Sequence, residues 1–365
     1  MKTSLFSSHL ALVALHLSSV TAQTYSSCNP LVGGNCPPDS ALGKAVNIDF
    51  TSGPSESFTP QGNPTYDSNG ASFTVAKSGD SPQLTSKWYI MFGHVEFVIK
   101  PAPGRGIVSS AVLQSDSLDE IDWEWLGSDN QQVQSNYFGK GQTTSYNRGA
   151  FHADPNNQGS FKTYTIDWTA EQTAWQIDGK TVRTLTPETA EQGQYPQTPM
   201  MIKIGAWSGG DSANAPGTVQ WAGGSTDYSA GPYSMQLKSI AVTDYSTGTK
   251  YTYSGTDGTW QSIQSDGKIN SSGKGASPVA AAAPAITSSS NSAPMPFEGT
   301  HRDESTYVKP DTYPWVASTL ATSASTTATT YPGLPAGWTV TSSGKVLPPS
   351  AASVSEQTLS IFPPS

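Results

Sequence analysis

Between about residues 45 and 265, apolar side chains recur at every second position, and Gly- or Pro-rich turns separate the runs. A period of two is typical of β-strands with one buried face. The dipeptide Asp178-Gly179 between two such runs predicts a tight hairpin turn. No helical stripe exceeds two turns. The sequence therefore predicts a sandwich or barrel, and we favour an all-β jelly roll of two antiparallel sheets. The clearest strand segments are residues 95–99, 107–113, 164–168, 175–177, 200–204 and 233–237.

The first 22 residues have the form of a secretory signal peptide. Lys2 gives a positive start, residues 10–17 form an apolar run too short to span a bilayer, and small residues precede position 23. An uncleaved anchor is the alternative. Cys28 and Cys36 follow at once, and two cysteines in an exported chain usually pair. We therefore expect a disulfide here rather than a metal site, because no histidine stands nearby.

The charge of the chain limits its ligands. Only 13% of the residues are charged, against about 25% in an average globular domain, and the net charge is −9. A negative chain of this kind disfavours nucleic acid as a partner. Neutral sugars remain possible ligands.

The composition changes near residue 271. Ala, Ser, Thr and Pro tracts follow, and such segments bury too little apolar surface to offset chain entropy. We expect a signal peptide at 1–22, a catalytic domain at 23–270 and a disordered low-complexity tail at 271–365, either an O-glycosylated stalk or a plain linker. Residues 302–315, which combine charges with three aromatic side chains, fit neither interpretation. Asn270-Ser271-Ser272 is a candidate N-glycosylation site at the domain edge.

The candidate catalytic residues are three acids at every second position. Because alternate side chains of a strand share a face, Glu120, Asp122 and Glu124 point one way. The intervening Ile121, Trp123 and Trp125 define the core face. The acidic face must be lined by solvent, since three carboxylates cannot be buried without partners.

Three neighbouring carboxylates repel one another, but glycoside cleavage can use them. One carboxylate attacks the anomeric carbon, and a protonated one gives its proton to the leaving oxygen. A retaining enzyme needs these groups about 5–5.5 Å apart. Positions i and i+4 lie roughly 13 Å apart along a strand, so the side chains must lean inward on a concave sheet. We expect the pair to titrate together, with a bell-shaped rate profile on the acid side of neutrality. A Ca²⁺ site or a solvated acidic edge are the alternatives, although Ca²⁺ ligands usually come from loops.

Candidate substrate-binding residues lie in two groups. Trp207 and Trp221 occur in Gly-rich segments and are predicted at the rim of a cleft, where they would stack on sugar rings. Tyr137, Lys140 and Arg148 follow the catalytic strand and are candidates for contacts with sugar hydroxyls or an N-acetyl carbonyl. Structural tryptophans and surface cations are the alternatives. The sequence has no HExxH motif, Cys/His cluster or GxSxG motif, so we expect no metal, no cofactor and no serine-hydrolase chemistry.

The run from Glu120 to Glu124 matches the ExDxE signature of glycoside hydrolase family 16. Over about residues 25–265 the chain resembles the fungal Crh transglycosylases, on the segments 28–31, 136–141, 164–168, 195–200 and 221–224. The resemblance implies a concanavalin-like jelly roll and a retaining mechanism. It implies that Glu120 is the nucleophile, Asp122 its helper and Glu124 the acid/base.

The same resemblance implies a substrate and a location. Such proteins move a chitin donor onto β-1,3/β-1,6-glucan or chitin acceptors in the cell wall, and we expect a secreted monomer. Many members carry a GPI signal, whereas this sequence ends without a run of 10–20 apolar residues, so anchorage stays open. A β-glucan or chitin hydrolase, or a carbohydrate-binding lectin on the same fold, are the alternative functions.

Overall fold

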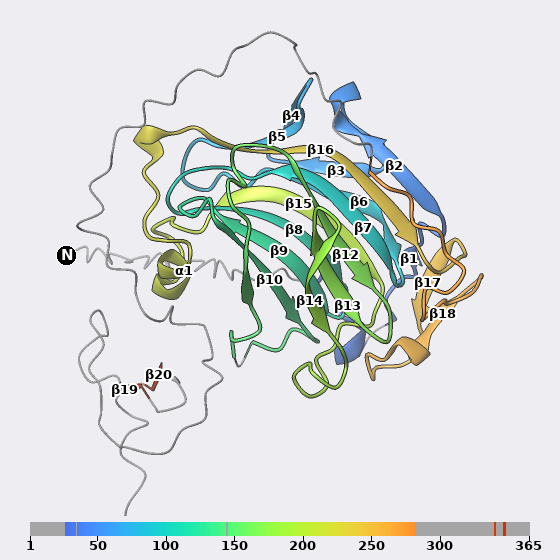
Figure 1. Cartoon of the computed structure of the whole chain (residues 1–365). Coiled ribbons are helices and arrows are strands. Elements are labelled where there is room, and N and C mark those ends of the chain that lie inside the picture. Colours follow the sequence, from blue (N-terminus) through green and yellow to red (C-terminus); the bar gives the residue numbers. More distant parts are fainter. Residues whose placement is uncertain (1–25, 34, 144, 282–338, 341–345, 348–365) are drawn as a thin grey trace, which may run out of the picture. The chain divides into compact units, whose positions relative to one another are not determined.

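The computed structural model describes residues 26–33, 35–143, 145–281, 339–340 and 346–347 (Figure 1). The chain divides into two units, residues 1–295 and 296–365. In the second unit, β19 (Thr339–Val340) pairs with β20 (Val346–Leu347) in antiparallel fashion. The predicted signal peptide, residues 302–315 and most of the predicted disordered tail lie outside the described residues.

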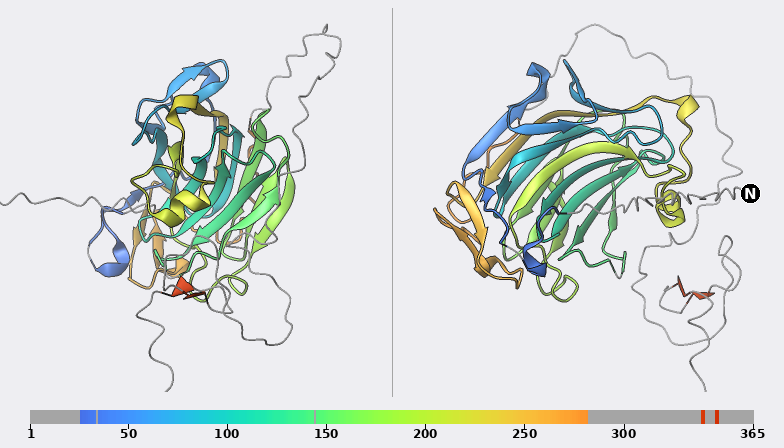
Figure 2. Two further views of the ribbon diagram at one scale, coloured as in Figure 1. Left: turned by 90° about the vertical axis from the view of Figure 1, so that its left-hand side faces the viewer. Right: turned by 180° about the vertical axis from the view of Figure 1, so that it is seen from behind.

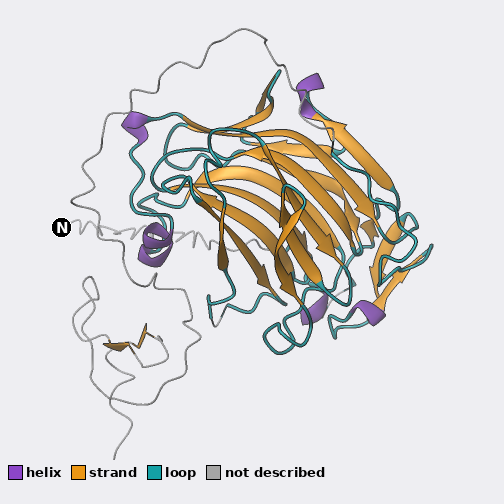
Figure 3. Cartoon of the chain, in the orientation of Figure 1, coloured by secondary structure: helices purple, strands orange, loops and turns teal. Residues whose placement is uncertain are grey.

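The first unit is built from two large antiparallel sheets, as the sequence predicts. They stack as the two layers of a curved sandwich, and helices are few and short (Figures 2 and 3). The seven-stranded sheet has the order β11 (Ala150–Ala153), β10 (Gln132–Phe138), β9 (Glu120–Leu126), β8 (Ile107–Ser115), β15 (Met200–Ser208), β6 (Gln83–Ile90), β3 (Phe58–Gln61). The eight-stranded sheet has the order β14 (Lys180–Leu185), β13 (Thr173–Ile177), β12 (Lys162–Trp168), β7 (Gly93–Lys100), β16 (Tyr233–Asp244), β5 (Gly70–Val75), β4 (Thr65–Asp67), with β2 (Ala45–Asp49) also on β16.

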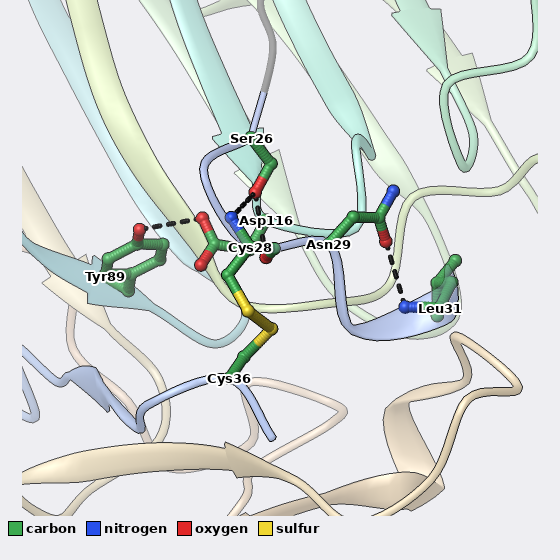
Figure 4. Close-up of a disulfide and its surroundings, with 7 residues drawn as sticks. All are labelled: Ser26, Cys28, Asn29, Leu31, Cys36, Tyr89 and Asp116. Atoms are coloured by element: carbon green, nitrogen blue, oxygen red, sulfur yellow. Dashed lines mark hydrogen bonds between the residues drawn. A yellow bond between two sulfur atoms is a disulfide. The ribbon is translucent and has the colours of Figure 1, made fainter. Parts of the chain in front are cut away.

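Smaller elements lie around the two sheets. A three-stranded sheet consists of β1 (Asp39–Ser40), β17 (Lys250–Tyr253) and β18 (Ile263–Ser265). The described helices are η1 (Pro30–Val32), η2 (Phe50–Ser52), α1 (Pro216–Trp221), η3 (Tyr228–Ala230) and η4 (Trp260–Ser262). The predicted Cys28–Cys36 disulfide is present next to η1 (Figure 4).

The core lies between the two large sheets and is rich in tryptophan. Trp123, Trp125, Trp168 and Trp175 are fully buried there, because each lies on the inward face of an alternating strand. Two indole N–H groups also bridge the sheets. Trp123 Nε1 donates to the carbonyl of Thr165 on β12 at 3.3 Å, and Trp175 Nε1 donates to the carbonyl of Asp122 on β9 at 3.1 Å. The strand β9 is thus hydrogen-bonded to both layers.

The predicted hairpin turn at Asp178-Gly179 joins β13 to β14. Both residues have positive φ, 47° and 77°, as a two-residue hairpin turn of the primed type requires. Gly179 adopts this conformation without cost to a side chain.

The folded part continues beyond the predicted boundary at residue 270. Val279 N donates to Thr243 Oγ1 at 3.0 Å, and Ala281 N donates to Glu96 Oε2 at 2.7 Å. Asn47 Nδ2 donates to the carbonyl of Ala280 at 3.1 Å. Residues 279–281 therefore run across β7, β16 and β2 on the outer face of the eight-stranded sheet.

Candidate active site

The predicted two faces of β9 are confirmed. Its inward side chains Ile121, Trp123 and Trp125 are fully buried in the core. Glu120 and Glu124 are half-buried on the outward face of the seven-stranded sheet. Asp122 departs from the expectation of a solvent-lined face, because it is only 2% exposed.

Neighbouring strands supply the surroundings of the acids. In register with Glu120 lie Gln114 on β8 and Phe138 on β10. Asn136 and Gln134 on β10 stand opposite Asp122 and Glu124. Gln114 Nε2 donates to Glu120 Oε2 at 3.2 Å. The residues in register with the acids are therefore neutral amides and an aromatic ring.

The surroundings of Asp122 favour its protonated form. Burial raises the pKa of its carboxyl well above the ordinary value, and repulsion from Glu124 and Glu120 in their ionised forms raises it further. A hydrogen bond to Glu120 acts in the same direction, while the Arg183 guanidinium opposes it. Among the described residues, Asp122 Oδ1 has no hydrogen-bond partner, which is less costly for a neutral carboxyl than for a carboxylate. Asp122 is therefore a donor to Glu120.

Glu124 also keeps its proton at neutral pH. Burial raises the pKa of Glu124 from 4.5 to about 8, and the charge of Glu120 adds to the shift. A carboxyl group that is protonated at neutral pH, on the same strand face as an acceptor carboxylate, is suited to general acid catalysis. The arrangement separates a proton donor, Glu124, from a hydrogen-bond acceptor, Glu120.

Trp207 and Trp221 lie on the same outward face. They stack with ring centroids 6.2 Å apart and an interplanar angle of 26°. Both are half-buried and pack against a small separate cluster, Val108, Leu126 and Ala222. Trp207 lies in β15 and Trp221 ends α1, so neither is in the loop that the Gly-rich segments suggested. Trp221 Nε1 donates to Oε1 of Gln134, the neighbour of Glu124, at 3.1 Å.

Tyr137 is not on this face, and its predicted role in substrate binding is wrong. It stands opposite Ile121 in the β9–β10 register, so its ring points into the core and is 3% exposed. Its hydroxyl accepts a hydrogen bond from Glu191 N, and the Arg183 guanidinium lies 5.4 Å from the ring centroid. Period-two alternation places Phe138, rather than Tyr137, beside the acids.

Lys140 is a structural cation instead of a substrate contact. Its Nζ lies 2.8 Å from Oδ1 of Asp119, a fully buried carboxylate. Asp119 Oδ2 also accepts hydrogen bonds from Gln197 N and Thr198 Oγ1. The ammonium group is thus occupied in holding the residue that immediately precedes β9.

Arg148 is likewise committed to the fold. Its guanidinium is buried, donates to Glu191 Oε2 and Gln194 Oε1 at 2.7 Å each, and donates to the carbonyls of Gln142 and Ser145. It lies 4.6 Å from the ring centroid of Phe138. Arg148 therefore packs against Phe138, and both of its terminal guanidinium nitrogens are committed to contacts within the fold.

Three further features concern metal binding, membrane-spanning helices and the candidate glycosylation site. Within the residues the structure describes, no group of three or more His, Cys, Asp or Glu side chains is suited to a metal ion. In the same part of the chain, no helix is long and apolar enough to cross a membrane. Asn270 of the glycosylation sequon donates Nδ2 to the carbonyl of Lys274 at 3.2 Å.

An all-β sandwich with three acids on one strand face defines a class of glycoside hydrolases, and comparison with known proteins agrees. Residues 53–223 match the family model described as "Glycosyl hydrolases family 16". The chain belongs to this family and, within it, to the Crh-like proteins.

Two relatives show how far the similarity extends. "Crh-like protein 4" of Aspergillus fumigatus is 61% identical over 337 residues, covering 92% of this chain and 74% of that protein. "Crh-like protein 4" of Botryotinia fuckeliana is 54% identical, covering 94% and 91%. The solved structure "Crh5 transglycosylase in complex with NAG" has a TM-score of 0.64 and 49% identity, covering 66% of this chain and all of that one.

Proposed function

We propose that this protein is a retaining transglycosylase that cleaves β-1,4-linked chitin and transfers it to β-glucan or chitin acceptors. The observation that carries the proposal is that two of the three acids on one strand face have raised pKa values. Burial raises the pKa of both Asp122 and Glu124, that of Glu124 to about 8, and the charge of Glu120 adds to both shifts. A solved relative that carries the name transglycosylase was found in complex with NAG, which supports an amino sugar as donor.

In the first step, Glu120 attacks the anomeric carbon while Glu124 gives its proton to the leaving glycosidic oxygen. The shortened chain departs as an alcohol, and the donor remains as an ester of Glu120. Asp122 donates a hydrogen bond to Glu120, and this bond keeps the carboxylate turned toward the sugar.

In the second step, Glu124 acts as a base. It takes the proton of an acceptor hydroxyl, the acceptor oxygen attacks the anomeric carbon, and Glu120 leaves as a carboxylate. Trp207 and Trp221, stacked on the same outward face, would supply an aromatic surface for sugar rings. A sugar held there competes with water by its high effective concentration, so transfer exceeds hydrolysis.

The experiment is incubation with end-labelled chitin oligomers. We expect products longer than the donor, and proton NMR of the first products before mutarotation to show the β configuration. Glu120→Gln and Glu124→Gln are expected to abolish turnover with unchanged circular dichroism, whereas Asp122→Asn is impaired less completely. Shorter products alone would indicate a hydrolase, and binding without turnover a lectin. An α product would contradict the covalent mechanism.

We also propose the cellular setting. Cleavage of residues 1–22 would release the chain into the secretory pathway, where the Cys28–Cys36 bond forms and Asn270 becomes glycosylated. The similarity of this chain to Crh-like proteins favours the cell wall as its destination. We expect a monomer, which sedimentation of the secreted protein would test.

A further inference from the structure

A buried route of hydrogen bonds links a lysine on β15 to Glu120. Lys203 lies on the outward face of the sheet, and its Nζ donates to Gln114 Oε1 at 2.6 Å. The same amide group donates from Nε2 to Glu120 Oε2 at 3.2 Å. Gln114 is only 3% exposed, so water does not compete freely for either of its ends.

The lysine determines which way the amide points. An ammonium group can only donate hydrogen bonds, so the side chain of Gln114 must turn its carbonyl oxygen toward Lys203. Its N–H group then has to face Glu120, which must accept. A carboxylate accepts such a bond more strongly than a protonated carboxyl does, so this orientation favours the ionised form of Glu120. Asp122 donates to the same carboxylate from within β9.

The charges around Lys203 come from two elements. Burial lowers the pKa of the ammonium, while the negative charges of Glu120 on β9 and of Asp116 in the β8–β9 turn raise it. Tyr89 on β6 donates its hydroxyl to Asp116 Oδ1 at 3.0 Å (Figure 4). Lys203 therefore interacts electrostatically with two acids, and Gln114 connects it to one of them, Glu120.

We propose that Lys203 is a positioning residue that acts through Gln114 to orient Glu120 and keep it ionised. This inference rests on the proposed function, in which Glu120 is the nucleophile. Without the ammonium group, Gln114 is free to turn its carbonyl oxygen toward Glu120, where it would favour the protonated carboxyl. The nucleophile would then be available only at higher pH.

The test compares Lys203→Met, Gln114→Met and the double variant by their rates on chitin oligomers from pH 4 to 9. Loss of a hydrogen bond to a charged group lowers kcat by about 10- to 100-fold. We expect this loss in each single variant, with KM changed less than kcat and the acid limb of the pH profile moved upward. Lys203→Arg, which keeps a charged donor, should recover most of the rate.

The double variant separates action through Gln114 from a direct effect of charge. If Lys203 acts through the amide, the double variant is no slower than the worse single variant. Losses that multiply would overturn the proposal, as would single variants within twofold of the wild type. A lower melting temperature without a shifted acid limb would also overturn it, since that is the result of a purely structural lysine.

Two controls complete the design. Lys87→Met removes a lysine charge from the same face of the sheet, on the neighbouring strand β6. The Lys87 ammonium is exposed and lies 3.8 Å from Glu56, so this variant should leave the pH profile unchanged. Glu120→Gln is measured alongside. If Glu120→Gln is inactive while the Lys203 and Gln114 variants behave as wild type, only the present inference fails. If Glu120→Gln is active, the proposed function fails.

Discussion

At the level of single residues, the electrostatics of the site follow from burial more than from contacts between opposite charges. Glu124 has a pKa of about 8 because burial desolvates it and the charge of Glu120 adds to the shift. From this pKa we expect an alkaline limb near pH 8, whereas the sequence suggested a profile on the acid side of neutrality. Sequence reveals that three acids share a face, but the depth of that face depends on the neighbouring strands.

We predict that kcat/KM falls as the pH rises through about 8, where Glu124 loses the proton it must donate. The same group affects stability. Its folded-state pKa is raised above the unfolded value of 4.5, so the stability that it contributes is complete below 4.5 and is lost as the pH rises through about 8. Melting curves should show a smaller fall in Tm between pH 5 and pH 9 for Glu124→Gln than for the wild type. An equal fall would contradict the assigned pKa.

Lys140→Met should destabilise the fold without weakening substrate binding. It would leave the fully buried Asp119 without its cation, a change that typically costs about 3–5 kcal/mol. Thermal unfolding and KM on chitin oligomers, measured together, check this. The double variant with Asp119→Asn should recover part of the loss. A raised KM at unchanged Tm would restore the binding role that the sequence suggested.

Sequence could not have shown what Lys140 and Arg148 contact, whereas alternation could have placed Tyr137 on the core face. Proximity along the chain to the acidic strand suggested all three, but the β9–β10 register decides which side chains share its face. The signal that was available is alternation: Phe138, at an even position in β10, faces outward with Asn136. Lys203 and Gln114 were missed for a similar reason, because β8 and β15 are adjacent only in the folded sheet.

At the level of elements, most strands were predictable and their order was not. Alternating runs such as 164–168 and 200–204 correspond to β12 and β15, because one buried face imposes a period of two on any antiparallel strand. Neither the neighbours of a strand nor its register is encoded locally. The hairpin is the exception, since Asp178-Gly179 specifies both turn and pairing of β13 with β14.

The hairpin offers a test of backbone strain free of packing effects. Gly179 has φ of +77° and nothing lies within 4 Å of an added Cβ, so Gly179→Ala should cost about 1–2 kcal/mol through conformation alone. Gly217 in α1 has the same open space without positive φ, and Gly217→Ala should not destabilise the protein. Chemical denaturation of the two variants gives the comparison. Equal effects would mean that strain at the turn is not the cause.

At the level of the whole molecule, the folded unit includes residues that composition placed in the tail. Residues 279–281 hydrogen-bond to Thr243, Glu96 and Asn47, and Glu96 also contacts His94 at 3.1 Å. Composition cannot detect an ordered segment such as residues 279–281, called the strap below, because its contacts are made by backbone groups. A Ser- and Ala-rich segment can therefore be ordered without any apolar pattern.

We expect a chain ending at residue 274 to melt a few degrees below one ending at residue 282, with equal activity on soluble oligomers. Each lost hydrogen bond contributes about 1 kcal/mol before the entropy of ordering the strap is subtracted. Differential scanning calorimetry of the two chains decides it. Equal melting temperatures would mean that the strap adds nothing to stability, and loss of activity would mean that it supports the site.

The two indole hydrogen bonds that join β9 to the opposite sheet affect how the protein can move. The Trp123 side chain of β9 donates to the opposite sheet, and the Asp122 carbonyl of β9 accepts from Trp175 of that sheet. We therefore expect β9 to separate from its neighbours only when the sandwich itself opens. Its amide protons should then exchange with solvent at the rate of global unfolding. In the proposed reaction, we therefore expect the spacing of the three acids to stay fixed while side chains of the flanking strands adjust to the sugar.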